Sequence, residues 1–322
     1  MRWRGAALQA SFVVAWSSGF VGARMGTDVA ATSTLLAWRF AILALIGAPL
    51  LRSVPAGERG HQTAVGLLSV VGYLLAITGA IELGVPAALA ALVAALQPAV
   101  TAALVGPVLG ATVPLRRWLG LAIGLAGTAL ALGADLRLGG APSWAYLLPL
   151  VAVASLLAAT LLEARRPSTS PPAAVLAWHG LVAAVAITAL AALQGGLRPD
   201  PSPTFWVAVG WLIVLSTLGG YGLYWATLRA TEPVRVATLI YLTAPVTALW
   251  AWLQFGDPLR PVVIAGLLIT LLGVRLARPG AAGSAAATRA TGATDGRPTT
   301  TGCGAAGSAR ARGRKGAGAP RR

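Results

Sequence analysis

Two basic residues lie near the middle of long apolar stretches that contain no other charge. Arg39 lies within residues 34–51, and His179 lies within residues 172–193. If these stretches cross a membrane, the insertion of a lone arginine at the helix centre costs about 2.5–3.5 kcal/mol of free energy. Such an arginine should therefore face other helices or a water-filled cavity. Arg39 could then attract an anionic group of a ligand. Alternatively, it could bond backbone carbonyls or Gln97, or extend toward the surface and hold two helices in register.

His179 is the only group in the middle of an apolar stretch that titrates near neutral pH. It is therefore a candidate for proton coupling, or else a hydrogen-bonded packing residue. Neither His179 nor the other histidine, His61, belongs to a motif such as HExxH, and the single cysteine, Cys303, has no partner for a thiolate metal site. We therefore predict no catalytic residue, no metal site and no cofactor.

Further polar and aromatic residues share the apolar stretches and could line a cavity together with Arg39. They are Trp16, Ser17, Tyr73, Gln97, Tyr221, Tyr224, Tyr241 and Thr243. Aromatic walls with few polar groups suit a small amphiphilic or aromatic ligand. Taken singly, each of these side chains could equally pack in a protein core or face lipid.

Pro98 and Pro245 lie inside long apolar stretches at corresponding places in the chain. Proline removes a backbone donor and clashes with the preceding turn, so it kinks a helix and frees carbonyl groups. Each proline could serve as a hinge beside a cavity, or as a static kink that improves packing.

The elements that would position these residues are membrane helices. The chain is 57% hydrophobic and 11% charged, with a mean hydropathy of +0.75, whereas about a quarter of the residues of soluble proteins are charged. A helix needs about 20 mainly apolar residues to cross a bilayer. We predict an all-α polytopic membrane protein with ten transmembrane helices. Their predicted limits are residues 5–23, 34–51, 63–81, 87–109, 118–133, 144–162, 172–193, 204–227, 236–255 and 261–277.

The ten predicted spans divide into two copies of one pattern, because a shift of 147 positions places the first half on the second. Matched pairs include Ser69 with Ser216, Gly72 with Gly219, Pro98 with Pro245 and, after a slip of one residue, Gly120 with Gly266 and Gly127 with Gly273. Each copy has five spans, an odd number, so the second copy must enter the bilayer the opposite way up. We predict two inverted five-helix repeats, residues 1–137 and 138–277, an arrangement that many secondary transporters use with the substrate site between the halves.

The distribution of arginines predicts the orientation. One side carries Arg2, Arg4, Arg52, Arg59, Arg116, Arg117, Arg165, Arg166, Arg229 and Arg235. The other side carries only Arg24, Arg137, Arg198 and Arg260. The positive-inside rule then predicts that both termini are cytoplasmic. We expect the protein in the cytoplasmic membrane.

Residues 278–322 form a tail of mainly Ala, Gly, Thr and Arg that carries about half of the net charge of +16. Such a composition predicts a disordered cytoplasmic tail that lies near anionic lipid. Nucleic-acid binding is not expected, because the tail lacks aromatic residues for base stacking. A membrane scaffold that acts through this tail is an alternative function, and an intramembrane enzyme is a less favoured one.

Four segments carry a resemblance to a known family: residues 15–21 (AWSSGFV), 38–40 (WRF), 90–98 (AALVAALQP) and 238–245 (TLIYLTAP). Because these segments occur in this order, the chain resembles the EamA-type transporters of the drug/metabolite transporter superfamily. The resemblance covers about residues 8–276. The resemblance implies a ten-helix carrier of small metabolites that works by alternating access, often as an exporter. It also implies that the first, third, fourth, eighth and ninth spans surround the substrate cavity.

The chain departs from the family pattern at two places. Asp257 follows Gly256 where the family often has glutamate, and Gln97 stands where an acid is common. The other carboxylates near the apolar stretches fall at span ends: Glu82, Glu163 and Glu232. Proton antiport, substrate exchange and facilitated diffusion therefore all stay open, as do the substrate and the direction of transport. The sequence is compatible with a homodimer without indicating one.

Overall fold

The computed structural model describes residues 2–97, 100, 114–133, 140–230, 236, 239–256 and 261–276. All of them belong to one unit, Met1–Pro279. Pro98, Glu232, Asp257 and the predicted tail 278–322 lie outside the described residues, so the roles predicted for them stay predictions.

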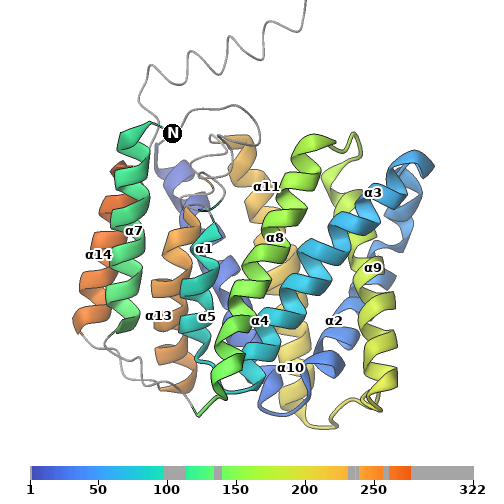
Figure 1. The fold of residues 1–322 in the computed structure, drawn as a ribbon. Coiled ribbons are helices and arrows are strands. Elements are labelled where there is room, and N and C mark those ends of the chain that lie inside the picture. The colour runs from blue at the N-terminus through green and yellow to red at the C-terminus, as the bar shows by residue number, and fades with distance from the viewer. Residues whose placement is uncertain are drawn as a thin grey trace, which may run out of the picture. The chain divides into compact units, whose positions relative to one another are not determined.

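Every element that the structure describes is helical, as the sequence predicts (Figure 1). The first half contains α1 (Arg2–Thr27), α2 (Thr32–Gly47), α3 (Ala56–Gly66), α4 (Tyr73–Glu82), α5 (Ala87–Ala94) and α7 (Leu115–Gly133). The second half contains α8 (Leu148–Arg165), α9 (Pro172–Leu193), α10 (Pro203–Trp211), α11 (Gly220–Ala230), α13 (Thr243–Phe255) and α14 (Pro261–Leu276). Short 3₁₀ turns cover Ala48–Ser53, Ser143–Leu147 and Ile240–Leu242.

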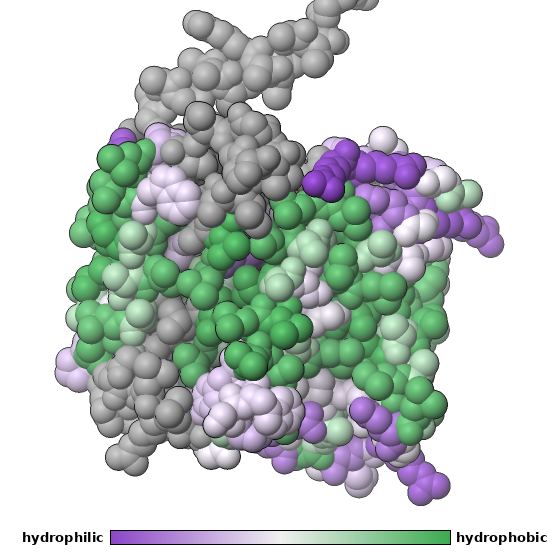
Figure 2. Space-filling view, viewed as in Figure 1, coloured by the Kyte–Doolittle hydropathy of each residue, from purple (hydrophilic) through white to green (hydrophobic). Residues whose placement is uncertain are grey.

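Six helical segments in the described part of the chain are long and apolar enough to cross a membrane: Gly5–Thr27, Thr32–Ser53, Ala56–Glu82, Ser143–Glu163, Pro172–Leu193 and Pro203–Tyr224. Their outward side chains are apolar, for example Leu45 and Leu193, which are 77% and 87% exposed. Figure 2 shows hydrophobic residues across the middle of the molecule and hydrophilic ones toward two opposite ends. Such a surface is stable in lipid rather than water, so this is a multi-pass membrane protein.

The remaining four predicted spans are shorter in the structure or leave its described part. Residues 118–133 and 261–277 correspond to α7 and α14, which have shorter apolar cores. The span predicted at 236–255 is described from residue 239 as a 3₁₀ turn followed by α13, and the one at 87–109 is described only in its first part, with α5. The total of ten membrane-crossing helices therefore stays a prediction.

The first span is longer than the predicted 5–23, because α1 continues to Thr27. Arg24, expected in the loop that follows, lies instead in the last turn of this helix. Its guanidinium carbon is 4.0 Å from the centre of the Phe255 ring. This cation–π contact and the favourable effect of a cation at a helix C-terminus explain why the helix includes the arginine.

The third and eighth predicted spans contain the same irregularity. In each, two α-helices are joined without a break by a π-helical segment, Leu67–Gly72 between α3 and α4 and Leu212–Gly219 between α10 and α11. The two segments end at Gly72 and Gly219, a pair that the sequence repeat matches. π-Helical turns are rare and occur frequently at functional sites. The two halves therefore share an unusual backbone conformation as well as a sequence pattern.

Helices α7 and α14 lie side by side and pack through glycine (Figure 1). A Cβ on Gly127 would come within 2.8 Å of the Gly266 carbonyl oxygen, and a Cβ on Gly273 would come within 2.7 Å of the Gly120 carbonyl oxygen. The contact is reciprocal, because the repeat matches Gly127 with Gly273 and Gly120 with Gly266. Residue numbers rise along one helix as they fall along the other, so these two corresponding helices are antiparallel.

Pro245 lies in the first turn of α13, directly after the 3₁₀ turn Ile240–Leu242. The sequence placed it inside a continuous helix, where it would remove a backbone hydrogen bond. In the structure the proline instead lies where one helix type changes to the other, two residues after the start of α13.

Helix α1 lies at the centre of the bundle, where it contacts α2, α4, α5, α10, α11 and α13. Phe12 and Phe20 of α1 belong to two separate clusters of buried apolar residues. Ser17 and Ser18 of this helix are buried, at 0% and 1% exposure, so they face neighbouring helices rather than lipid.

Candidate binding cavity

A cavity of about 70 Å³ lies among α1, α2, α4, α9, α11 and the two π-helical segments. A water molecule needs at least about 10–15 Å³ of such space, so the cavity accommodates a small solute or several waters. Of the predicted cavity residues, it brings together Trp16, Arg39, Tyr73 and Tyr221, with His179 beside them. The remaining polar lining comes from Thr78, Ser216 and Thr217.

Arg39 is buried, at 5% exposure, and binds the second π-helical segment. Its Nε and Nη2 donate to the Thr217 hydroxyl oxygen at 3.2 and 2.8 Å, and Nη2 is 3.5 Å from the Ser216 hydroxyl. The Thr217 hydroxyl in turn donates to the Leu212 carbonyl at 2.9 Å. In the described part of the chain, Nη1 has no hydrogen-bond partner and no carboxylate forms an ion pair with this guanidinium. Arg39 is therefore held on one side and open to a partner on the other.

The protein partner of Arg39 is thus neither Gln97 nor a backbone carbonyl, the two hydrogen-bond partners that the sequence analysis named. Gln97 is half-buried and does not line the cavity. Ser216 approaches closely because α1 has a glycine opposite it: a Cβ on Gly19 would come within 2.7 Å of the Ser216 hydroxyl oxygen.

Aromatic rings form one wall of the cavity. The ring centres of Trp16 and Tyr221 are 5.4 Å apart, with an angle of 56° between the planes. Tyr224 lies behind them, 6.1 Å from Trp16 and 5.9 Å from Phe12, and is not part of the lining. Tilted aromatic pairs of this kind are favourable beyond the area they bury, so the wall has a defined shape.

Three other predicted cavity residues lie in the protein core instead. The Ser17 hydroxyl is 2.7 Å from the Val13 carbonyl oxygen and 3.2 Å from the Thr243 carbonyl oxygen, and it joins α1 to α13. Thr243 is 2% exposed, and Tyr241 is 1% exposed within a hydrophobic cluster. Their position indicates a role in packing α13 against α1.

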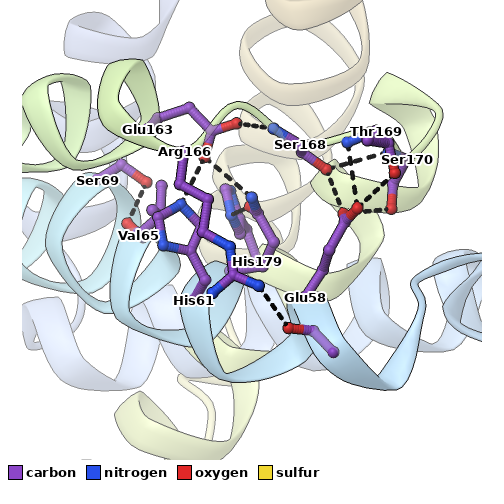
Figure 3. Close-up of polar contacts among 12 residues, drawn as sticks. Glu58, His61, Val65, Ser69, Glu163, Arg166, Ser168, Thr169, Ser170 and His179 are labelled. Carbon is purple, nitrogen blue, oxygen red and sulfur yellow. Dashed lines mark hydrogen bonds and ion pairs between the residues drawn. The ribbon is translucent and has the colours of Figure 1, made fainter.

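His179 is hydrogen-bonded, as one interpretation of the sequence expected. Its Nε2 is 2.9 Å from Gln62 Oε1, and Gln62 Nε2 donates to Glu163 Oε2 at 2.9 Å. His61 Nε2 lies 3.3 Å from the same carboxylate oxygen, an ion-pair distance without the alignment of a hydrogen bond. Figure 3 shows Glu163, His61 and His179 close together, with Glu163 also accepting from the backbone N–H of Ser168 at 2.8 Å.

Sequence reasoning missed Gln62, Ser216 and Thr217. Gln62 falls one residue before the predicted third span and therefore seemed to belong to a loop. Ser216 was noticed only as a repeat position. A hydroxyl pair in the middle of an apolar span is a weak signal, since such residues often bond their own helix.

Comparison with known proteins places these features in context. The model of the EamA-like transporter family matches the chain twice, over residues 3–133 and 143–278. A curated protein of Salmonella typhimurium (strain LT2), named "Probable amino-acid metabolite efflux pump", is 25% identical over 279 residues, which cover 81% of this chain and 90% of that protein. A protein of known crystal structure shares the fold, with a TM-score of 0.66 at 20% identity over 85% of this chain and 97% of its own.

Proposed function

Because this chain belongs to the EamA-like transporter family, we propose that it is a secondary transporter that exports a small, carboxylate-bearing metabolite across the cytoplasmic membrane by alternating access. The observation that carries the proposal is Arg39, a buried cation that faces a cavity and lacks a carboxylate partner within the described residues. Membership of this family favours a transporter over an enzyme.

The proposed architecture is two inverted five-helix repeats around the cavity, with both termini in the cytoplasm. Two features support it. The corresponding helices α7 and α14 are antiparallel and exchange equivalent glycine contacts, and the corresponding third and eighth spans share a π-helical segment. The cavity is lined from both halves, which is where an inverted-repeat carrier places its substrate.

The substrate class follows from charge and shape. A buried arginine that keeps free donors is most favourable when an anion completes its coordination, because charge-assisted bonds to a carboxylate are about twice as strong as neutral ones. The aromatic wall beside Arg39 would contact the apolar part of the same molecule. The name of the Salmonella relative, an amino-acid metabolite efflux pump, supports the same class.

Everted membrane vesicles provide the test, because export then appears as uptake. We expect vesicles with the protein to accumulate at least one of radiolabelled alanine, leucine and phenylalanine faster than vesicles without it. Unlabelled amino acid should compete, whereas the amine that lacks only the carboxylate (ethylamine, isoamylamine or phenethylamine) should not.

Arg39→Gln is the matched variant, since glutamine keeps hydrogen-bond donors but has no charge. Uptake should fall by about tenfold or more. This factor corresponds to the loss of one charge-assisted hydrogen bond, which contributes about 1.5–3 kcal/mol of binding free energy. Equal uptake with and without the protein for all three amino acids would overturn the proposed substrate class, as would equal competition by amine and amino acid.

A further inference from the structure

We propose that His179, Gln62 and Glu163 form a proton-coupling site, and that the proton is the second solute exchanged in transport. The inference rests on the proposed function and adds its energy source. The sequence alone gave no carboxylate for this purpose, because Glu163 falls at a span end.

Hydrogen bonds join the three residues in a continuous row between the cavity and one face of the molecule. His179 of α9 lines the cavity, and Gln62 of α3 is fully buried between its two partners. The Glu163 side chain of α8 is 36% exposed, so it can exchange protons with water. Both hydrogen bonds measure 2.9 Å, and the loop after α8 belongs to the face that the arginines predict to be cytoplasmic.

Close packing of α3 against α9 keeps the hydrogen-bonded residues Gln62 and His179 close together. A Cβ on Gly66 would come within 3.0 Å of the His179 ring. One turn earlier, the Trp178 indole nitrogen donates to the Thr63 hydroxyl at 3.1 Å. Glycine at one contact and a polar pair at the next therefore fix the register of α3 against α9, which places Gln62 opposite His179.

The amide of Gln62 makes the states of its two neighbours depend on each other. Its NH₂ group faces Glu163 Oε2, which accepts, and we assign this arrangement to the ionised carboxylate, whose two oxygens can only accept. Its oxygen then faces His179, whose Nε2 must donate. If Glu163 is protonated and donates instead, the amide turns over, its NH₂ group faces His179, and Nε2 must accept. One buried side chain thus excludes the arrangement in which both neighbours present a donor.

The proton balance of one cycle follows from these two arrangements. In the second arrangement Glu163 is protonated and His179 is neutral, with its hydrogen on Nδ1. When the cavity is open to the outside, His179 takes a proton from it on Nε2, the amide turns over, and Glu163 releases its proton to the cytoplasmic water at its own face. When the cavity is open to the cytoplasm, His179 releases the Nε2 proton there, the amide turns back, and Glu163 takes up a proton from the same cytoplasmic water. Both hydrogens of the amide stay on nitrogen throughout, and the gain and loss at Glu163 cancel. One proton therefore moves inward through His179 as the metabolite moves outward.

Three other charged side chains near these hydrogen-bonded residues form their bonds elsewhere. On α3, Glu58 accepts from residues 168–170, and Arg59 donates to the Val54 carbonyl. On α8, Arg166 donates to the Gly57 carbonyl. His61 faces Glu163 directly, and Arg39, Tyr73 and Tyr221 line the cavity with His179.

The described carboxylates are Asp28, Glu58, Glu82, Glu163 and Asp200. Of these, Glu163 alone is joined by hydrogen bonds to a residue that lines the cavity. Glu82, for example, accepts from the backbone N–H of Thr32 at 3.0 Å. Glu163 is therefore the carboxylate that can exchange protons with the site.

The first test uses the fact that the whole chain has two histidines. With ¹⁵N-histidine, the full-length protein in lipid nanodiscs gives two imidazole spectra, which a His61→Gln variant assigns. The His179 titration midpoint should move by about one pH unit or more in Glu163→Gln and in Gln62→Leu, as coupled sites require. Glu58→Gln, which changes a nearby carboxylate outside the hydrogen-bonded row, should leave it unchanged. A midpoint that is the same in all four proteins would overturn the proposal.

The second test uses proteoliposomes and whichever of alanine, leucine and phenylalanine moves fastest. An imposed pH gradient should drive the wild type to accumulate the amino acid, whereas Gln62→Leu should lose this accumulation but keep exchange of amino acid for amino acid. A merely structural role would lower both together. If none of the three moves in the wild type, the proposed function fails and proton coupling with it. If one moves without response to the gradient, only the coupling role is wrong.

Discussion

Arg39 and Thr217 lie 178 positions apart in the chain, and two guanidinium nitrogens of the first donate to the hydroxyl of the second. The repeat matches Thr217 with Val70, which also lines the cavity but has no hydroxyl. The two halves therefore supply the same backbone irregularity and different chemistry. At this position only the second half offers a hydroxyl group to the arginine.

Thr217→Val gives the second half the side chain of the first and should impair the transporter. The change keeps the shape of the residue but leaves two donors of Arg39 without their acceptor, which should destabilise the protein by about 1–3 kcal/mol. Thermal unfolding of the purified protein in detergent measures this loss, and amino-acid uptake should fall with it. Ser69→Ala is the control, because Ser69 bonds only the Val65 carbonyl of its own helix, at 2.7 Å. Equal melting temperatures for the two variants would show that Thr217 does not hold Arg39.

Gly127→Ala should weaken the pairing of α7 with α14. The added methyl group would come within 2.8 Å of a carbonyl oxygen, and overpacking of this kind costs about 1–3 kcal/mol. The melting temperature should therefore fall. At Gly222 in α11 an added Cβ would meet nothing within 4 Å. Gly222→Ala should leave the melting temperature unchanged or raise it. Alanine has the higher helix propensity and could add at most about 1 kcal/mol to the free energy of unfolding.

Truncation after Pro279 should leave transport intact. The described helices all lie within Met1–Pro279, and the family match ends at residue 278. Vesicles with equal amounts of truncated and full-length protein should take up the same amino acid at rates within about twofold, since the change removes no residue that lines the cavity. Complete loss of uptake from a normally inserted, truncated protein would favour a scaffold function for the basic tail.

Reporter fusions at the two termini should both be cytoplasmic. The ten predicted spans would place the two termini on the same side, and the excess of arginine predicted for that side would make it cytoplasmic. Green fluorescent protein at either end should fluoresce, and alkaline phosphatase at either end should be inactive. Fusions that give opposite results at the two ends would contradict the inverted five-helix repeats on which the alternating-access proposal depends.

The sequence by itself predicted the membrane class, the helical fold and the family. These properties depend on local features: the length of each apolar stretch, the arginines at its ends, and motifs that recur along the chain. It also identified Arg39 and His179 as unusual, because a polar group in an apolar helix must find a partner whatever the tertiary structure.

Only the tertiary structure decided which partners these are. Arg39 binds Thr217 rather than Gln97, and His179 reaches Glu163 through Gln62, because helix rotation and depth determine which side chains meet across the bundle. The same geometry separates Trp16 in the cavity wall from its neighbour Ser17, which bonds α13. A difference of one residue turns a helix by about 100°, and a hydrophobic pattern that is apolar all round does not indicate which face lies inside.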